Sequence, residues 1–255
     1  MNKKLQIFSI VLITTGLIIL TACAEKEVEN KIEDNIGSSN KISNKLDNNQ
    51  NSKSNGDNNE IEISNPKNEN NEILKDLLPN QTGFRWVYNG FAEYGNILEL
   101  KRINYEAPDY QYILEGEVED MSDGESKLDF SVKLQYLLKN GELVQIKEEE
   151  IMMDSIFDNL IIIKAPLKVG NTWIQRAVDK EGNHLEVKGT ITKIELENGK
   201  RVYDIKYEYG DDSLFEFRRI KEGVGTVQFQ KPFISDGNTF EIGYSLNEEG
   251  SGYDK

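Results

Sequence analysis

The residues able to do covalent or metal chemistry in this chain are few. The sequence contains one cysteine, Cys23, and one histidine, His184. Zinc sites combine several cysteine and histidine ligands, so an ordinary zinc site is excluded. The sequence also lacks a Gly-x-Ser-x-Gly turn, a glycine-rich phosphate loop and a His-Glu-x-x-His motif. We therefore expect no metal, no cofactor and no catalytic residue, and predict that the protein is not an enzyme.

Acidic side chains are the remaining candidates for chemistry. They cluster at Glu148-Glu149-Glu150, at Asp154 with Asp158, and at Asp211-Asp212. Paired carboxylates can hydrolyse glycosidic bonds or bind calcium. None of these clusters has the spacing of a calcium loop, and any chain this acidic contains such pairs. We expect them to lie at solvated edges and turns, and His184 to occupy a partly exposed strand position.

The N-terminal residues have the layout of a secretory signal. Lys3 and Lys4 precede an almost wholly apolar run from Leu5 to Ala22. The run ends in Leu20-Thr21-Ala22-Cys23, which resembles the lipobox of bacterial lipoproteins. The alternative is an uncleaved transmembrane helix, because eighteen apolar residues could nearly span a bilayer.

The lipobox resemblance implies a lipid anchor at Cys23. In that family the thiol receives a diacylglyceryl group, fatty acids such as palmitate supply the acyl chains, and the chain is cut before the cysteine. Residues 1–22 would then be the signal peptide. Two or three acyl chains make a stable anchor, which one chain alone does not. The resemblance places the mature protein on the extracytoplasmic face of the cell membrane. Cys23 is the only cysteine, so the domain has no disulfide.

The charge of the chain limits its partners. It has 30 basic and 45 acidic residues, and removal of the signal takes away Lys3 and Lys4 to leave a formal charge of −17. So acidic a protein lacks the basic surface that binds nucleic acid, and anionic membrane surfaces repel it. We expect no nucleic-acid partner and contact with the membrane only through the lipid.

Residues 23–72 have the composition of a disordered tether. Residues 24–72 include 14 asparagines and no aromatic residue. Such a segment cannot bury enough apolar surface to offset the entropy of ordering it. As a flexible chain it would span roughly 40 Å.

Residues 73–255 are predicted to form an all-β domain. The residues Ile73 to Leu78 could form one or two helical turns, and beyond them apolar residues alternate with polar ones, as in Tyr203, Ile205, Tyr207 and Tyr209. Asn140-Gly141 and Asn198-Gly199 are typical of tight hairpin turns. We count about twelve antiparallel strands with no long helix between them, which predicts a barrel, a half-barrel or a sandwich.

The domain contains an internal repeat. At a constant offset of 87 residues, eight positions between Pro79 and Lys101 recur between Pro166 and Lys188, among them Gly83 with Gly170 and Trp86 with Trp173. We predict two homologous units, residues 79–165 and 166–252, each of about six strands. The ungapped alignment predicts that Leu98 superposes on Leu185 and Ile97 on His184.

The second unit also resembles a module of many exported Gram-positive lipoproteins of unknown function. The residues that carry this resemblance are Ala165 to Trp173 and Gly223-Val224-Gly225. Its motifs are structural, so the resemblance implies a fold and a location and no activity.

Two groups of apolar residues could line a binding site or fill the core. The domain is rich in tyrosine and phenylalanine, and we expect most of them in the core, although a half-open barrel could hold a lipid, glycan or peptide. The stretch from Ile151 to Ile163 joins the two units and contains Met152 and Met153. It is expected to form a short capping helix and then a strand, or a simple buried connector.

Three classes of function remain. The first is a non-catalytic binding module for a hydrophobic or extended envelope ligand, or for an envelope protein. The second is a structural or assembly factor of the envelope without a small ligand. The third is a carboxylate-based hydrolase of wall polysaccharide. A cavity would favour the first class over the second, and two carboxylates about 5–9 Å apart in a cleft would favour the third.

Overall fold

The computed structural model describes residues 66–90, 94–122, 124–210, 214–235 and 237–254. The predicted signal, Cys23 and the tether up to residue 65 lie outside these ranges. Within them, no helix has the length and apolar character needed to cross a membrane.

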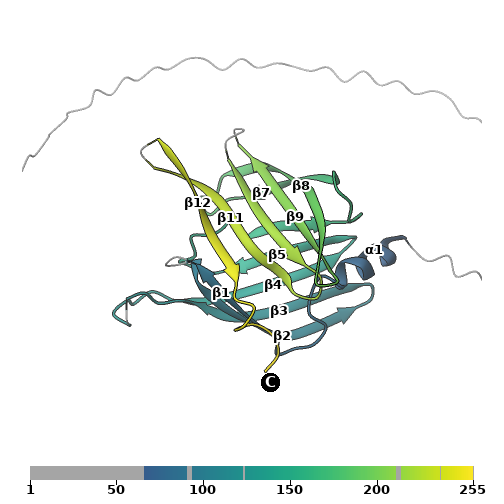
Figure 1. Ribbon diagram of the computed structural model, residues 1–255, viewed down its shortest axis with the longest axis horizontal. Helices are drawn as coiled ribbons and strands as arrows, with labels where there is room; N and C mark the ends of the chain where they lie inside the picture. The colour runs from purple at the N-terminus through teal and green to yellow at the C-terminus, as the bar shows by residue number, and fades with distance from the viewer. Residues whose placement is uncertain (1–65, 91–93, 123, 211–213, 236, 255) are drawn as a thin grey trace, which may run out of the picture. The chain divides into compact units, whose positions relative to one another are not determined.

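Twelve antiparallel strands form one sheet that curls into a nearly closed barrel (Figure 1). Strands that are consecutive in the chain pair with one another, except β6 and β7. Because β1 also pairs with β12, two six-stranded meanders, β1–β6 and β7–β12, are joined in one sheet. The strands are β1 (Arg85–Gly90), β2 (Asn96–Glu106), β3 (Asp109–Val118), β4 (Ser131–Lys139), β5 (Glu142–Glu148), β6 (Asn159–Lys164), β7 (Thr172–Val178), β8 (His184–Glu197), β9 (Lys200–Tyr209), β10 (Phe215–Lys221), β11 (Gly225–Ser235) and β12 (Asn238–Leu246). The all-β prediction of about twelve strands is confirmed, and the architecture is the barrel.

The alternation of side chains and the turn residues account for this sheet. In β9 the aromatic residues Tyr203, Tyr207 and Tyr209 are buried on the inner face, as their spacing predicts. Asn140-Gly141 and Asn198-Gly199 have positive φ at both residues and connect β4 to β5 and β8 to β9. This is the geometry of the tight hairpin turns that the sequence predicts.

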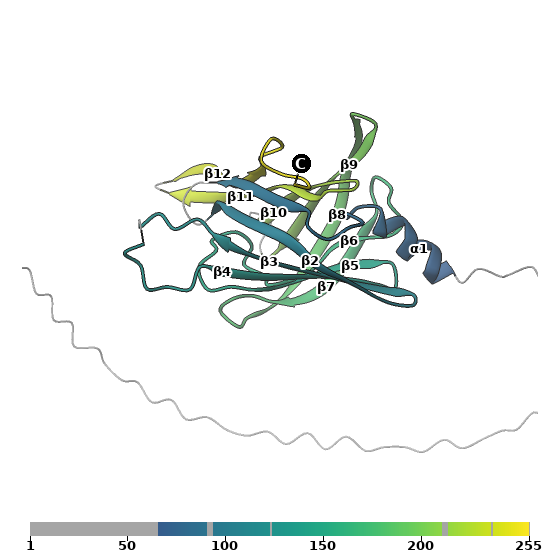
Figure 2. The ribbon, with the colours of Figure 1, turned by 90° about the horizontal axis from the view of Figure 1, so that it is seen from below.

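One helix, α1 (Pro66–Lys75), closes one end of the barrel (Figures 1 and 2). It begins before the expected position, so residues 66–72, assigned to the tether, are helical. Leu74 and Leu77 are fully buried, and Asn71 bridges two hairpins: its Nδ2 donates to the Pro108 carbonyl at 2.9 Å and its Oδ1 accepts from the Gly141 amide at 2.8 Å. The composition of residues 66–72 does not indicate a helix, because the helix is held to the barrel by one amide side chain and a few leucines.

The two meanders repeat the same entry into the sheet. Trp86 and Trp173 lie in the first strand of their meanders, are 2% and 4% exposed, and follow glycines with positive φ, Gly83 and Gly170. The Gly83 amide donates to the carbonyl of Leu100 in β2, and the Gly170 amide donates in the same way to β8. Both tryptophans therefore occupy equivalent places.

The ungapped alignment is wrong beyond the first strand of each meander. Trp86 pairs with Leu98, whereas Trp173 pairs with Gly189 and not with Leu185. The bulge in β2 follows Leu100 and the bulge in β8 follows Ile191. These equivalent bulges are 91 residues apart, four more than the offset of 87 in the alignment. The second strands correspond at an offset of 91, so Leu98 does not superpose on Leu185, nor Ile97 on His184. Four extra residues in the β7–β8 hairpin explain the error.

The two junctions between the meanders differ. At one, β1 and β12 form a backbone ladder in which Tyr88 pairs with Leu246. At the other, β6 and β7 are the two edges of the sheet. Gln175, the counterpart of Tyr88, bridges them with its side chain: its Oε1 accepts from the Ile161 amide at 2.7 Å, and its Nε2 donates to the Ile161 carbonyl at 3.1 Å. One amide side chain thus takes the place of a backbone partner.

The connection between β5 and β6 lies at the end of the barrel opposite α1. Residues 149–158, here called the cover segment, form no helix, contrary to one of the two expectations. Met152 and Phe157 are buried, so the segment is an irregular buried connector that leads into β6.

Candidate binding site

The inner face of the barrel is filled by side chains. Thirty buried residues form one continuous hydrophobic cluster, which includes Trp86, Tyr112, Leu114, Leu134, Tyr136, Trp173, Ile191, Tyr203 and Ile205. Protein interiors of this kind are close-packed, so a lipid could enter only by displacing core side chains. Most of the aromatic residues therefore belong to the core, as expected, and the search for a ligand site moves to the surface.

A buried arginine lies within this core. Arg218 is 1% exposed, and its Nη1 donates to the Gln145 Oε1 at 2.7 Å. Its guanidinium lies 5.7 Å from the ring centre of Tyr207 and 5.5 Å from that of Phe229. Such cation–π contacts are stronger when desolvated, so they help to hold the buried charge.

Glu216, two residues before Arg218 on β10, holds the cover segment. Its carboxylate lies 3.9 Å from the Arg218 Nη2, beyond hydrogen-bond distance. It accepts instead from the Ser155 Oγ at 2.8 Å and the Ile156 amide at 3.1 Å. Burial raises the pKa of Glu216 above its ordinary value, although Arg218 opposes this.

Lysines hold the same segment from the barrel wall. The Lys147 Nζ lies 2.5 Å from the Asp154 Oδ1 and 3.4 Å from the Glu149 Oε1, and Lys180 also pairs with Glu149. The Lys231 Nζ donates to the Asp154 carbonyl at 2.5 Å. Burial alone would raise the pKa of Asp154, but Lys147 outweighs it and the pKa lies below its ordinary value.

The expectation of solvated acidic clusters is therefore wrong for two residues. Asp154 and the side chain of Glu149 are almost fully buried in ion pairs. Glu148 and Glu150 are exposed, as expected. Asp211 and Asp212 lie outside the described residues. The two buried carboxylates serve to hold the cover segment, which is a structural role.

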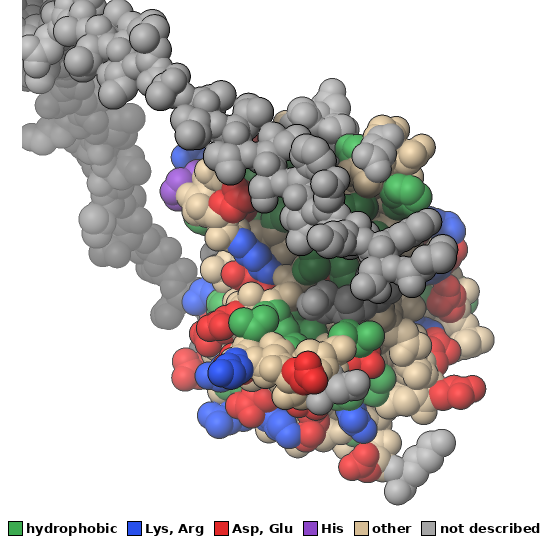
Figure 3. All heavy atoms as spheres, turned by 90° about the vertical axis from the view of Figure 1, so that its left-hand side faces the viewer, with side chains coloured by type: hydrophobic (Ala, Val, Ile, Leu, Met, Phe, Trp, Pro, Cys, Tyr) green, Lys and Arg blue, Asp and Glu red, His purple; other side chains and the backbone are tan. Residues whose placement is uncertain are grey.

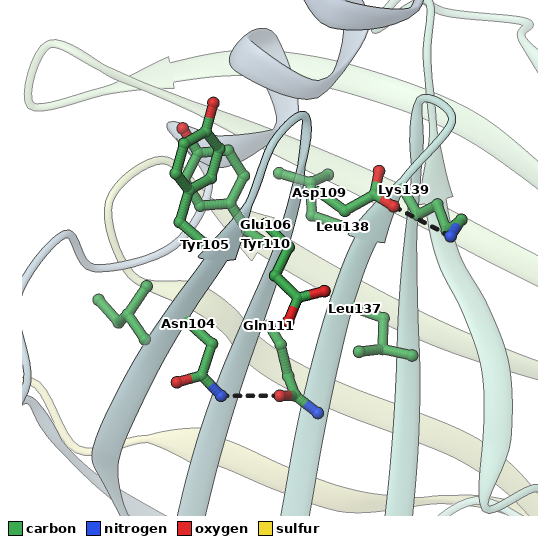
Figure 4. Close-up of a pocket in the computed structure, with 10 residues that line it drawn as sticks. Asn104, Tyr105, Glu106, Asp109, Tyr110, Gln111, Leu137, Leu138 and Lys139 are labelled. Carbon is green, nitrogen blue, oxygen red and sulfur yellow. Dashed lines mark hydrogen bonds and ion pairs between the residues drawn. The ribbon is translucent and has the colours of Figure 1, made fainter.

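An open pocket of about 610 Å³ lies where β2, β3 and β4 approach α1 (Figure 4). We call it the outer-face pocket because Asn104, Gln111 and Leu137 point outward from the sheet there. Its lining comprises Ile103, Asn104, Tyr105, Glu106, Asp109, Tyr110, Gln111, Leu137, Leu138 and Lys139. Its size lies within the range of about 300–1,000 Å³ of small-molecule sites.

Side-chain amides cross three strands at the outer-face pocket. The Asn104 Nδ2 donates to the Gln111 Oε1 at 2.8 Å, and the Gln111 Nε2 donates to the Gln135 Oε1 at 3.0 Å. The register places Asn104 opposite Gln111 and Gln111 opposite Leu137, beside Gln135. Each amide side chain has more donor and acceptor sites than these two hydrogen bonds use, so the row of amides presents hydrogen-bonding groups to solvent.

Two tyrosines lie at the end of the outer-face pocket next to α1. The register places both on the inner side of the sheet, because Tyr105 pairs with Tyr110 and Tyr110 pairs with the buried Leu138. The rings of Tyr105 and Tyr110 lie 4.6 Å apart between centres, and Tyr105 is 59% exposed. The Tyr110 hydroxyl donates to the Glu72 Oε1 at 3.1 Å, and the Lys75 Nζ lies 5.4 Å from the Tyr110 ring centre. The helix thus positions Tyr110, and Tyr110 supports the exposed ring of Tyr105.

The carboxylates at this pocket do not resemble a hydrolytic pair. The Asp109 Oδ2 lies 3.0 Å from the Lys139 Nζ. A glycosidase needs two carboxylates free to act on the bond that is cut, and here the Asp109 carboxylate is held in an ion pair. Glu106 supplies a hydrogen-bonding group to the pocket.

The residues that the sequence singled out do not meet at one site. Cys23 lies outside the described residues, and His184 is exposed at the start of β8, as expected. Within the described ranges, no three His, Cys, Asp or Glu side chains are grouped to hold a metal. Sequence reasoning missed Asn104, Gln111 and Gln135. The sequence feature that could have identified these residues is an amide side chain at an outward position in each of three consecutive strands. This feature can be recognised only when the pairing register of the hairpins is known.

Comparisons with known proteins give limited information. No family model matches the chain, and no curated protein matches its sequence. One similar solved structure is a protein inferred to be exported, with a YmcC-like fold, from Bacteroides fragilis NCTC 9343; it is 14% identical, with a TM-score of 0.38, over 66% of this chain and 96% of the other. Another is an inferred lipoprotein from Parabacteroides distasonis ATCC 8503, 12% identical, with a TM-score of 0.38, over 67% and 96% of the two chains. Similarity at this level establishes neither a family nor a function.

Proposed function

We propose that this protein is a lipoprotein anchored at Cys23 on the extracytoplasmic face of the cell membrane, where its barrel binds an extended envelope polysaccharide without catalysis. The observation that supports this ligand is the outer-face pocket, whose lining includes the outward amides Asn104 and Gln111 and, at the end next to α1, the exposed Tyr105. The anchor is supported by the lipobox residues Leu20 to Cys23.

The chemistry of the outer-face pocket suits a sugar chain. A pyranose ring has an apolar C–H face and a rim of hydroxyls. The exposed face of Tyr105 is a rigid apolar platform that loses little side-chain entropy on binding. Asn104 and Gln111 offer donors and acceptors to hydroxyls. Because the pocket lies on an open face, a chain longer than the pocket can extend past it along the sheet.

The charge of the pocket favours a neutral chain. Lys139 neutralises Asp109, which leaves Glu106 as the unneutralised charge among the lining residues. A polyphosphate chain would meet repulsion from Glu106 and from a protein of strongly negative charge. An uncharged polysaccharide meets neither. The packed inner face argues against a lipid ligand.

Calorimetric titration with a hexamer of N-acetylglucosamine tests this proposal. We would use the mature chain, residues 23–255, with Cys23→Ser, and compare it with Tyr105→Ala and Gln111→Ala. Loss of the platform is expected to weaken binding about tenfold, which corresponds to roughly 1.4 kcal/mol. Tyr253→Ala is the matched control, because Tyr253 is 43% exposed and is not part of the pocket lining. Equal affinities for Tyr105→Ala and the parent chain would refute the site.

The anchor needs a separate test. Cells fed a labelled fatty acid should label the parent protein and should not label Cys23→Ala, which should also accumulate uncleaved precursor. A labelled Cys23→Ala protein would contradict the lipobox interpretation.

A further inference from the structure

The end of the barrel opposite α1 carries an exposed apolar groove. A pocket of about 280 Å³ lies between the β3–β4 connection and the cover segment. Its apolar lining consists of Met121, Leu128, Phe130 and Ile151, and Met121 and Leu128 are 62% and 61% exposed. Large exposed apolar side chains at a concave site are typical of interaction surfaces.

An acidic pocket borders this groove. It has a volume of about 390 Å³, and its lining comprises Asp129, Ser131, Lys133, Lys147, Glu148, Glu149, Glu150 and Asp158. Asp129 lies between Leu128 and Phe130 in the chain, and Glu150 precedes Ile151, so residues of the two linings are direct neighbours along the chain. Figure 3 shows hydrophobic and acidic side chains next to one another on this end of the barrel.

The carboxylates of the acidic pocket are only partly neutralised. Lys147 and Lys180 are engaged with Glu149 inside the fold. Glu148 and Glu150 are exposed. Of the lysines in this lining, Lys133 remains to offset the other carboxylates, because Lys147 is already paired inside the fold. The groove is therefore an apolar surface beside an excess of negative charge.

The methionines of the mature chain gather at this end. Apart from Met1 the chain contains three, namely Met121, Met152 and Met153. Met121 is part of the groove and Met153 is 55% exposed, whereas Met152 is buried. The unbranched, polarisable side chain of methionine adapts to different partners and is common at binding surfaces.

We propose that this end of the barrel docks a basic amphipathic segment of another protein, with an apolar side chain in the groove and lysines or arginines at the acidic pocket. Charge complementarity selects the occupant, because the acidic border attracts cations and repels an anionic membrane surface. The site is separate from the outer-face pocket, so either proposal can fail without the other.

Methyl NMR on the mature chain with Cys23→Ser tests the docking directly. The probe is a peptide of about twelve residues with alternating lysine and leucine, an extended ligand with one apolar and one basic face. The Met121 and Met153 methyl signals should shift on titration, while the buried Met152 signal should move less. Raising the salt concentration should weaken binding, because the charges involved are exposed.

Matched peptides and variants decide the outcome. Leu128→Ser and Glu150→Gln should each weaken binding about tenfold or more if they belong to the energetic centre of the site. Leu196→Ser is the control, because Leu196 is 71% exposed at the opposite end of the barrel. A lysine–serine peptide that binds as well as the lysine–leucine peptide would overturn the proposal, since charge alone would then suffice. So would an unchanged Met121 signal, or anionic lipid vesicles that shift it as strongly as the peptide.

Discussion

The inner and outer faces of β2, β3 and β4 are made by alternate residues of the same strands, yet they differ in every physical respect. On β4 the inward residues Leu134, Tyr136 and Leu138 are at most 5% exposed, whereas the outward residues Gln135 and Leu137 border or line an open pocket. Two-residue periodicity thus separates two tasks. The inner face determines the fold, and the outer face is free to vary for binding.

Buried charge sharpens this contrast. The inner face contains Lys147, Glu216 and Arg218, all nearly fully buried. Lys147 and Glu216 anchor the cover segment, through Asp154 and through Ser155 and Ile156. Buried ion pairs contribute little net stability compared with apolar residues, but removal of one partner is strongly destabilising. We infer that they specify where the segment lies.

The largest expected effect is the loss of an inner-face tryptophan. Trp86→Ala and Trp173→Ala should each lower the free energy of unfolding by about 3–5 kcal/mol, because each removes a buried indole. Each indole also donates a hydrogen bond, from the Trp86 Nε1 to the Val224 carbonyl at 2.7 Å and from the Trp173 Nε1 to the Ile161 carbonyl at 3.3 Å. Urea unfolding of both variants measures this. A small loss at only one of them would break the equivalence of the repeats.

Breaking one buried ion pair should have the next largest effect. Asp154→Ala is expected to cost about 3 kcal/mol because it leaves Lys147 buried without its closest carboxylate. Lys147→Met combined with Asp154→Leu should restore much of the loss. Urea midpoints at neutral pH test this, and a double variant as unstable as Asp154→Ala would contradict it.

The same pair predicts a pH dependence. The pKa of Asp154 is depressed in the folded state, so its contribution is present above the unfolded value of about 3.9 and is lost as the pH falls through the folded value. The pKa of Glu216 is raised, so its contribution falls as the pH rises above its unfolded value of about 4.3. As the pH rises above ~4 toward neutrality, Glu216→Gln should therefore gain stability relative to the parent chain. Unfolding free energies across this range measure it, and a relative loss would show the wrong sign.

A smaller effect is expected at the seam between β6 and β7. Gln175→Leu removes the two bonds that Gln175 makes to Ile161 and leaves the bond from the Trp173 Nε1. Water can reach this half-buried site, so the loss should be about 1 kcal/mol. The Ile161 amide should exchange with solvent faster, while the amides of the β1–β12 ladder should not change. Equally faster amide exchange at both junctions would show that Gln175 does not stabilise the β6–β7 seam specifically.

The smallest effect on stability is expected at the exposed Tyr105, at the end of the outer-face pocket next to α1. Tyr105→Ala should change the free energy of unfolding by no more than about 0.5 kcal/mol, because the ring is mostly exposed. Urea unfolding checks this, and it also ensures that any loss of saccharide binding reflects the pocket. A loss above about 2 kcal/mol would assign Tyr105 to the fold.

The sequence predicts the antiparallel strands well, leaves the choice among barrel, half-barrel and sandwich open, and predicts the surface poorly, for identifiable physical reasons. Alternating residues such as Tyr203, Tyr207 and Tyr209 reveal inner faces because burial selects residue type directly. Helix α1 was misplaced because its docking depends on the long-range bonds of Asn71. The row of Asn104 and Gln111 depends on register between strands, which no local pattern specifies.

The most direct test of the division between inner and outer faces is chemical-shift mapping of the mature Cys23→Ser chain during titration with the N-acetylglucosamine hexamer. Side-chain amide signals of Asn104, Gln111 and Gln135 should shift together with the Tyr105 ring, while the inner residues Gln145 and Tyr207 should remain unchanged. Shifts confined to Gln145 and Tyr207, with the outer amides unmoved, would place the ligand inside the barrel and contradict the account.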